Sequence, residues 1–163
     1  MAILEIKEYG EPVLREKSLP VKKVTPEISD FIRDMAETMY TASGVGLAAP
    51  QVGVLKRIIV IDGQEEGLIA LINPKIVRSE GEVNEEEGCL SFPDMYSKVK
   101  RSSRVTVEGL NQKGKQIEIT KEGLIARALQ HEIDHLDGIL FIDRIGRVER
   151  QILLNKLKKQ KTS

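Results

Sequence analysis

The sequence is poor in the residues from which most metal and redox sites are built. Among 163 residues there is one cysteine, and there are two histidines. A single cysteine excludes an internal disulfide, which fits a reducing compartment, and the cytoplasm is the expected location. A closed structural zinc site normally takes four Cys or His ligands, and this chain supplies at most three unless a carboxylate joins them. Three protein ligands with one open position are typical of a catalytic metal site.

Other features are scarce or missing as well. Tryptophan is absent and aromatic residues make up 4%, so the core must be largely aliphatic. Lys and Arg together number 25, as do Asp and Glu, and a formal charge of zero gives no reason to expect DNA binding. The start, MAILEIKEYG, lacks the apolar segment of a signal peptide. No apolar run approaches the roughly 20 residues of a membrane span, so no membrane partner is expected.

The length suits one domain with a real core and is short for two. No internal repeat or linker divides the chain, so residues 1–163 are predicted to form a single domain. Thr25 followed by Pro26 is typical of a helix start, and apolar residues at helical spacing extend this helix to about Tyr40. The stretch VERQILLNKLKK predicts a basic, amphipathic C-terminal helix over about 147–160.

Between these helices the sequence favours strands. Residues 57–61, 68–72 and 75–80 are expected to be strands, with Asn73 and Pro74 as a turn between the last two. The segment VTVEGLNQKGKQIEI predicts a hairpin around Asn111 to Gly114, and GILFID is expected to return as a short strand. Strands grouped between segregated helices predict an α+β fold.

A further helix is expected to start at a Thr120 cap and to stop at Gly138. Four of its residues are expected to face a core: Leu124, Ala128, Leu129 and Leu136. The helix contains QHEIDHLDG, in which His131 and His135 lie one turn apart on the same face. Two such histidines can bind one metal ion, although a short HExxH pattern also arises by chance on a helix surface.

Glu132 and Cys89 are the candidates to complete this site. Glu132 is offset from His131 by about 100° around the helix, which disfavours it as a ligand and favours it as general base toward a bound water. Cys89 is the only thiol and lies in EGCLSFP, after three glutamates and a glycine. A buried small hydrophobe is its alternative role. Glu149, in the C-terminal helix, is the alternative third ligand, as in zincin-type peptidases.

Three separate segments together resemble the signature motifs of bacterial peptide deformylases. They are GVGLAAPQVG (44–53), EGCLSFP (87–93) and QHEIDHLDG (130–138), in the order and spacing of the family. GEPVLR at 10–15 is similar too, so the resemblance covers essentially the whole chain. The expected fold is α+β, with antiparallel sheets packed around a central metal-binding helix between an N-terminal and a C-terminal helix.

The resemblance implies a metal-dependent hydrolase that removes the N-formyl group from the initiator methionine of nascent polypeptides and releases formate. Cys89, His131 and His135 would bind the metal, which activates a water molecule. Glu132 would take the proton of that water and pass it to the departing amine. The family assigns oxyanion stabilisation to the backbone N–H of Leu90, together with the side-chain amide of Gln51.

The same resemblance implies where the peptide binds. The segment Gly44, Val45 and Gly46 would flank the substrate, with backbone near Gly46 pairing with an extended peptide as an added strand. Val45 would also line the methionine pocket. Arg127 lies one turn before His131, and its methylene stem could line the same pocket; a simple surface arginine is the alternative.

The sequence also suggests which metal ion is bound and a second binding partner, the ribosome. One cysteine and two histidines by themselves favour zinc, whereas the family works with Fe(2+), for which zinc, nickel or cobalt often substitutes. The basic C-terminal helix could dock on the ribosome through phosphate contacts. A solvated helix face is the alternative.

Two other functions stay open at this point. One is a zincin-like metallopeptidase that uses Glu149 as its third ligand. The other is a catalytically silent, deformylase-like protein that only binds metal or a formylated peptide. Glu132 and Gln51 argue against the silent protein, because a binder needs no general base.

Overall fold

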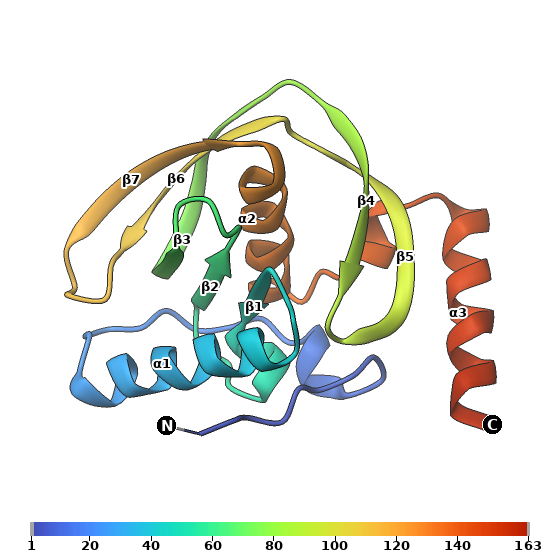
Figure 1. The fold of residues 1–163 in the computed structure, drawn as a ribbon, viewed down its shortest axis with the longest axis horizontal. Helices are drawn as coiled ribbons and strands as arrows, with labels where there is room; N and C mark the ends of the chain where they lie inside the picture. Colours follow the sequence, from blue (N-terminus) through green and yellow to red (C-terminus); the bar gives the residue numbers. More distant parts are fainter. Residues whose placement is uncertain (1, 163) are drawn as a thin grey trace.

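The computed structural model describes residues 2–162 and has an α+β fold with two antiparallel sheets, as predicted (Figure 1). The larger sheet has the spatial order β1-β2-β3-β6-β7 and the smaller one pairs β4 with β5. The strands of the larger sheet are β1 (Gly46–Ala48), β2 (Ile58–Asp62), β3 (Leu68–Glu80), β6 (Arg104–Leu110) and β7 (Gln116–Glu122). The smaller sheet is made of β4 (Val83–Cys89) and β5 (Phe92–Arg101).

The helix α2 (Gly123–Leu136) packs against the larger sheet at the centre of the molecule, as expected (Figure 1). Its buried residues Ile125, Leu129 and Ile133 belong to one cluster with Ile59 and Ile61 of β2. The cluster contains only aliphatic side chains, in line with the low aromatic content. The helix that carries the HEIDH motif is therefore anchored in a buried aliphatic cluster.

The helix α1 (Pro26–Thr41) packs against the opposite face of β2. Its Met35 and Met39 share a second cluster with Ile58 and Val60 of that strand. Successive side chains of β2 thus point alternately to α2 and to α1, and the strand is buried on both faces. The predicted start of α1 is confirmed, because Thr25 Oγ1 accepts a hydrogen bond of 3.3 Å from the Ile28 N–H.

The predicted turn at Asn73 and Pro74 is wrong, because β3 runs unbroken through both residues. Asn73 has a φ of +55°, and the register of β3 against β6 shifts at this point. The Asn73 side chain accepts a hydrogen bond of 2.8 Å from the Val21 N–H and donates one of 2.8 Å to the Val21 carbonyl. A β-bulge, stabilised by contacts with a distant segment, replaces the turn.

The predicted start of α2 at Thr120 is also wrong. Thr120 belongs to β7, where its hydroxyl contacts that of Thr106 across the strand pair at 2.9 Å, and the helix begins at Gly123 with a φ of +63°. Leu124 is 46% exposed instead of facing the core, whereas Leu129 and Leu136 are buried as expected. Ala128 is partly buried. The hairpin around Asn111 to Gly114 is confirmed.

The segment GILFID is not a strand. Its last three residues belong to the 3₁₀ helix η3 (Phe141–Arg144), which follows Leu140. The Asp143 carboxylate accepts a hydrogen bond of 2.9 Å from the Leu140 N–H and forms an ion pair with Arg15 in η1 (Pro12–Arg15). These two contacts stabilise a tight turn in a segment whose apolar residues favour a strand.

The amphipathic C-terminal helix is confirmed as α3 (Arg147–Thr162). Its Leu153 and Leu157 pack in a third cluster with Leu14, Phe92 and Phe141, which places α3 beside β5 and η3 (Figure 1). Within the described residues, every helix is too short or too polar to cross a membrane.

Candidate metal centre and active-site cavity

The end of β4 and the middle of α2 bring three candidate metal ligands together. Cys89 Sγ lies 3.4 Å from His135 Nε2, and that nitrogen lies 3.3 Å from His131 Nε2. All three donor atoms fall within 4.8 Å of one another, and in residues 2–160 this is the group with metal-binding geometry. Glu149, the alternative ligand, is exposed in the first turn of α3 and does not belong to it.

The chemistry of this cluster fits a divalent cation. One sulfur and two imidazole nitrogens are the donors that zinc and neighbouring transition metals prefer. Burial alone lowers the pKa of His131, yet the Glu132 carboxylate and the Cys89 sulfur raise it well above its ordinary value. A metal ion at this cluster would supply the positive charge that the Glu132 carboxylate and the Cys89 sulfur attract, without a proton on His131 Nε2.

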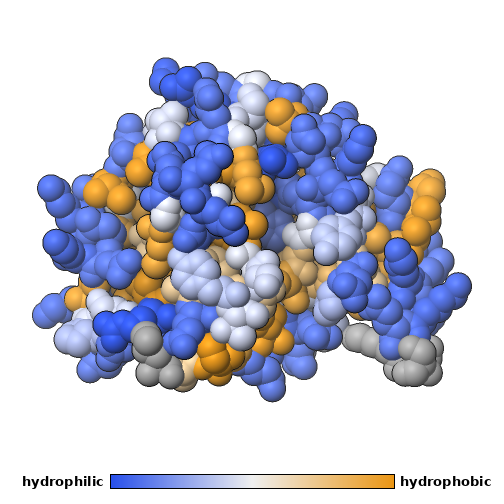
Figure 2. Space-filling view, in the orientation of Figure 1, coloured by the Kyte–Doolittle hydropathy of each residue, from blue (hydrophilic) through white to orange (hydrophobic). Residues whose placement is uncertain are grey.

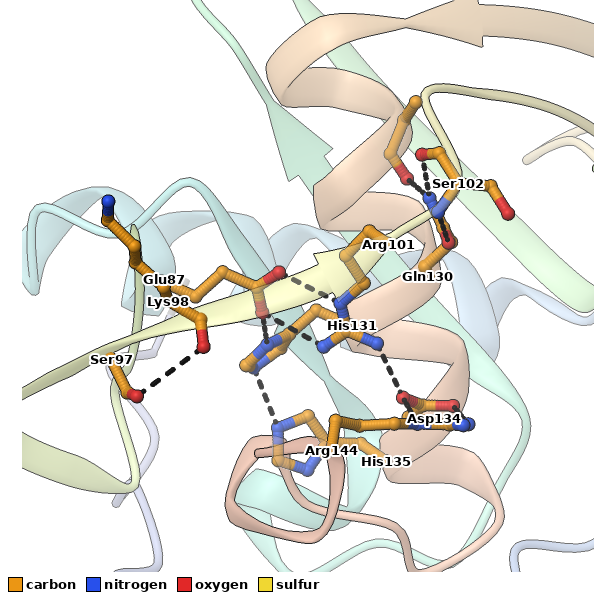
Figure 3. Close-up of polar contacts among 11 residues, drawn as sticks. Glu87, Ser97, Lys98, Arg101, Ser102, Gln130, His131, Asp134, His135 and Arg144 are labelled. Atoms are coloured by element: carbon orange, nitrogen blue, oxygen red, sulfur yellow. Dashed lines mark hydrogen bonds and ion pairs between the residues drawn. The ribbon is translucent and has the colours of Figure 1, made fainter. Parts of the chain in front are cut away.

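A carboxylate orients the first histidine of the motif. Glu87 Oε1 lies 3.0 Å from His131 Nδ1, and Arg101 holds the same carboxylate through two hydrogen bonds of 2.8 and 2.9 Å (Figure 3). Burial tends to raise the pKa of Glu87, but Arg101 and His131 lower it to about 2. The ionised Glu87 accepts the Nδ1–H of His131, which leaves Nε2 free to bind a metal.

This carboxylate is part of a longer chain of charges that reaches the surface. Arg101 donates to Asp134 at 2.7 Å, and Arg144 donates to the same carboxylate at 2.8 and 3.0 Å (Figure 3). The Arg101 side chain is only 4% exposed, whereas that of Arg144 is 45% exposed. The sequence alone did not predict that Arg101, Asp134 and Arg144 support the site. The one available indication was the position of Asp134, three residues after His131 on the same side of the helix.

Glu132 is buried in α2 and lines the cavity next to the cluster. Its Oε1 has no hydrogen-bond partner among the described residues, and its Oε2 lies 2.6 Å from the position that a Cβ on Gly46 would take. Burial, the largest influence, raises the pKa of Glu132 to about 7. A carboxyl group held against a glycine backbone with one free oxygen can exchange a proton with a small molecule in the cavity.

Gln51 approaches the cluster from η2 (Ala49–Val52). Its Oε1 accepts a hydrogen bond of 2.9 Å from the Ala48 N–H, which fixes the direction of the amide. The Nε2 then donates to Ser91 Oγ at 3.1 Å and lies 3.6 Å from Cys89 Sγ. The buried amide nitrogen of Gln51 therefore points toward Cys89. Its hydrogen bond to Ser91 was not predicted from the sequence.

A cavity of about 540 Å³ lies beside the Cys89 and His131 side chains. Its walls include five residues that the sequence singled out for substrate or oxyanion contacts: Gly44, Val45, Gly46, Leu90 and Arg127. Glu132, His131 and Cys89 lie on the same walls. The face of the molecule between β1 and the β4–β5 hairpin is hollowed between hydrophilic flanks (Figure 2). The cavity thus joins the metal-ligand cluster to solvent.

Comparison with known proteins gives a consistent result. The family model for polypeptide deformylase matches residues 3–151. The chain is 54% identical to a peptide deformylase of Thermodesulfovibrio yellowstonii, over 99% of this chain and 100% of the relative. It is 56% identical to a peptide deformylase of Halothermothrix orenii, over 94% and 100%. A crystal structure of a peptide deformylase from Legionella pneumophila superposes with a TM-score of 0.93 at 47% identity, covering 99% of this chain and 96% of that one.

Proposed function

The chain belongs to the polypeptide deformylase family, and from that premise we propose a role for each residue of its cavity. The protein is a hydrolase that removes the N-formyl group from the initiator methionine of nascent polypeptides and releases formate. The observation that carries the proposed roles is the meeting of Cys89, His131 and His135 with the buried Glu132 at one open cavity.

Cys89, His131 and His135 would hold one divalent metal ion. Such an ion would supply Lewis acidity, which makes water a better nucleophile and a carbonyl a better electrophile. Glu87 supports this role, because its contact with His131 Nδ1 keeps the other ring nitrogen directed at the cluster. Two of the three residues, Cys89 and His131, line the cavity.

Glu132 moves the proton of the reaction. It accepts a proton from water as the oxygen attacks the formyl carbon, and it returns that proton to the nitrogen as the C–N bond breaks. The products are formate and a free N-terminal amine. The absence of a competing partner for Oε1 within the described residues supports this role.

Gln51 and Leu90 stabilise the negative charge that develops on the formyl oxygen. The side-chain Nε2 of Gln51 and the backbone N–H of Leu90 are the proposed donors. The hydrogen bond from Ala48 to Gln51 Oε1 supports this role, because it fixes the amide before substrate arrives. A donor that is already oriented needs no reorganisation during the reaction.

The peptide lies along β1, which is the edge strand of the larger sheet. Backbone near Gly46 pairs with an extended chain, since an exposed strand edge accepts such a partner, and Gly44 flanks it. Val45, Leu90 and the stem of Arg127 line the pocket for the methionine side chain. Their common place on the cavity walls supports this assignment.

A single assay tests the function. Metal-loaded protein is incubated with formyl-Met-Ala-Ser, and formate and the free peptide amine are both measured. Equal amounts of the two products are expected. Cleavage of an internal peptide bond without formate would instead favour an endopeptidase, and binding without any turnover would favour a silent protein.

The working metal is Fe(2+), with zinc, nickel or cobalt able to replace it. The mixed sulfur and nitrogen donors support this range of metals, since affinity alone does not select among them. The test divides one metal-free preparation into anaerobic iron-loaded and zinc-loaded halves. Higher formate release per bound metal is expected for iron, and an equal or higher rate with zinc would contradict the assignment.

The basic helix α3 docks on the ribosome, where formylated chains emerge in the cytoplasm. Arg147 and Lys156 are exposed on this helix, whereas Leu153 and Leu157 are buried, so the outer face of α3 presents basic side chains that could contact phosphates. Co-sedimentation with ribosomes at low and moderate salt, with and without residues 156–163, tests this. Identical binding by both forms would favour the alternative, in which the outer face of the helix is only solvated.

Residues 1–163 act as one catalytic domain.

A further inference from the structure

The N-terminal arm, residues 2–9, contains neither helix nor strand, yet it is anchored at both ends. The Leu4 N–H donates to Thr38 Oγ1 of α1 at 2.8 Å, and the Leu4 side chain packs against the cluster shared by α1 and β2. The chain then runs past α1 toward the β4–β5 hairpin (Figure 1). Beyond the arm, Leu14 of η1 is buried in the third cluster. The stretch from Leu4 to Leu14 is therefore held between two separate hydrophobic clusters.

Two backbone N–H groups of this arm reach segments that are far away in the sequence. The Lys7 N–H donates to the Gln51 carbonyl at 2.6 Å, and the Tyr9 N–H donates to the Ser91 carbonyl at 2.9 Å. In an extended segment, residues two positions apart direct their N–H groups to the same side. One short stretch of the arm therefore joins η2 to the turn between β4 and β5.

Both acceptors lie where the oxyanion donors are proposed to be. Gln51 carries the side-chain donor itself, and Ser91 directly follows Leu90, whose backbone N–H is the second donor. Gln51 Nε2 also donates to Ser91 Oγ at 3.1 Å, so Gln51 and Ser91 are joined both directly and through the arm. Lys7, Gln51, Ser91 and Tyr9 thus form a closed ring of contacts.

The two segments that carry these donors have little regular structure of their own. Gln51 belongs to the four-residue 3₁₀ helix η2, and Leu90 and Ser91 form the turn between β4 and β5. Short 3₁₀ helices have few and poorly aligned internal hydrogen bonds, so their position depends on contacts with neighbouring segments. The arm supplies one such contact to η2 and one to the turn.

We propose that the N-terminal arm fixes the relative position of the two oxyanion donors, with Lys7 and Tyr9 as positioning residues that act through the Gln51 and Ser91 carbonyls. The inference rests on the proposed function, because it takes Gln51 and Leu90 as the donors to the formyl oxygen. The charge on this oxygen develops only in the transition state, so misplaced donors lower kcat and leave substrate binding largely unchanged. A displacement near 1 Å can cost about 100-fold in rate.

Proline at position 9 removes the relevant hydrogen bond and preserves the local backbone. The Glu11 N–H donates to the Glu8 carbonyl at 3.1 Å and Gly10 has a φ of +108°, which indicates a β-turn with Tyr9 at its second position. Proline is favoured at that position of a turn, so Tyr9→Pro should keep the turn while losing the N–H and the ring. Tyr9→Ala is the matched control. It removes the ring, whose centroid lies 4.9 Å from that of Phe92, and keeps the N–H.

Lys7 offers the same comparison independently. Lys7→Pro removes the N–H that donates to Gln51. Lys7→Ala keeps this N–H and removes only the side chain, which forms an ion pair with Glu5 at 2.6 Å. The two proline variants break different contacts of the ring, so each gives a reading where the other does not fold.

The test measures kcat and KM for formyl-Met-Ala-Ser, the affinity for the product Met-Ala-Ser, and the metal content of each metal-loaded variant. The product lacks the formyl oxygen, so its binding reports on the peptide site without the oxyanion donors. Both proline variants are expected to lower kcat by about 10–100-fold while KM, product affinity and metal content stay near wild type. Both alanine variants should keep kcat near wild type as well.

A double substitution shows whether Lys7 acts through Gln51. Gln51→Ala removes the side-chain donor, and its kcat should fall by about 100-fold or more. Adding Lys7→Pro to Gln51→Ala should then lower kcat far less than Lys7→Pro does alone, since the effects of residues that act as a unit do not add.

The possible outcomes separate the arm from the oxyanion donors. If Gln51→Ala loses kcat but both proline variants keep it, the positioning role of the arm is overturned and the proposed role of Gln51 stands. Metal content or product affinity that falls together with kcat would also overturn positioning, because the arm would then only stabilise the fold. Fully additive effects of Lys7→Pro and Gln51→Ala would do the same. Wild-type kcat in Gln51→Ala would overturn the proposed oxyanion role, and the inference with it.

Discussion

The Glu132 carboxylate packs directly against Gly46. A Cβ at position 46 would lie 2.6 Å from Glu132 Oε2, so a side chain there would collide with the carboxylate in its present position. We expect Gly46→Ala to displace the carboxylate and to lower kcat by about 100-fold, the typical cost of a misplacement near 1 Å. Metal content should stay unchanged. Formate release and metal analysis on one preparation measure both.

Gly146→Ala is the matched control for this substitution. A Cβ on Gly146 would also meet a glutamate carboxylate, that of Glu149, but Glu149 is exposed and free to turn away. This variant should retain wild-type turnover. If Gly46→Ala were as active as Gly146→Ala, the contact with Gly46 would have no bearing on the position of Glu132.

Glu132→Gln separates metal binding from proton transfer. The amide has nearly the same shape, so His131 and His135 should keep their places and the metal should remain bound. An amide cannot accept the proton of the attacking water, and loss of such a transfer typically costs 10²–10⁴-fold in rate. Metal analysis, a peptide-binding titration and a formate assay test the prediction together. Loss of the metal would show instead that Glu132 has a structural role.

Cys89→Ser should nearly abolish metal binding. A hydroxyl is a weaker ligand than a thiolate, and the remaining two histidines would have to hold the ion with it. Cys89→Asp should keep part of the metal, because a carboxylate can still coordinate. Metal content after dialysis against a weak chelator ranks the three proteins. Full occupancy in the serine variant would remove Cys89 from the ligand set.

Arg101→Met should destabilise the fold and loosen the metal at the same time. The arginine is 4% exposed, and its removal leaves the Glu87 carboxylate buried without its main partner. Breaking such a pair costs about 3–5 kcal/mol of the free energy of unfolding, and a lost support of a metal ligand weakens affinity roughly 10–100-fold. Urea unfolding and competition with a chelator measure the two effects.

Arg104→Met is the control for Arg101→Met. Its ion pair with Glu122 lies on the surface, with the two side chains 50% and 69% exposed. Exposed pairs contribute about 1 kcal/mol at most, so stability and metal affinity should both stay near wild type. Equal effects of the two substitutions would contradict a special role for the buried chain of charges.

Asp143 should make stability depend on pH in acid. Burial tends to raise its pKa, but Arg15 and the Leu140 N–H lower it below the ordinary value of 3.8. A lowered pKa in the folded state stabilises the protein above pH 3.8, and this contribution is lost as the pH falls through the folded pKa. Metal-free wild type should unfold at higher urea than Asp143→Asn at pH 6. The gap should shrink below pH 3.8, and a constant gap would contradict the prediction.

Much of the site could be predicted because its information is local. The i, i+4 spacing of His131 and His135 fixes their common face, and the Thr25–Pro26 start fixes the beginning of α1. These two inferences need only the chain's own covalent geometry and helical period. The third ligand is different: composition left both Cys89 and Glu149 as candidates, and the resemblance to the deformylase motifs favoured Cys89.

The errors arose where distant contacts override local preference. Asn73 stays in β3 because its side chain bonds to Val21, more than fifty residues away along the chain. Thr120 stays in β7 because it pairs with Thr106, and the turn after Leu140 depends on the link between Asp143 and Arg15. The support of His131 by Glu87 and Arg101 likewise requires β5 to be folded beside β4.

The short length of β1 has a consequence for the behaviour of the protein at high concentration. An unpaired sheet edge is a template for self-association as well as for a peptide. With Gly46–Ala48 as its whole extent, β1 can template a few residues of a peptide but offers little to another sheet. At the opposite edge, β7 is longer and carries Glu118, Lys121 and Glu122, whose charges discourage stacking between molecules. The edge proposed to bind the substrate is thus the one too short to nucleate aggregation.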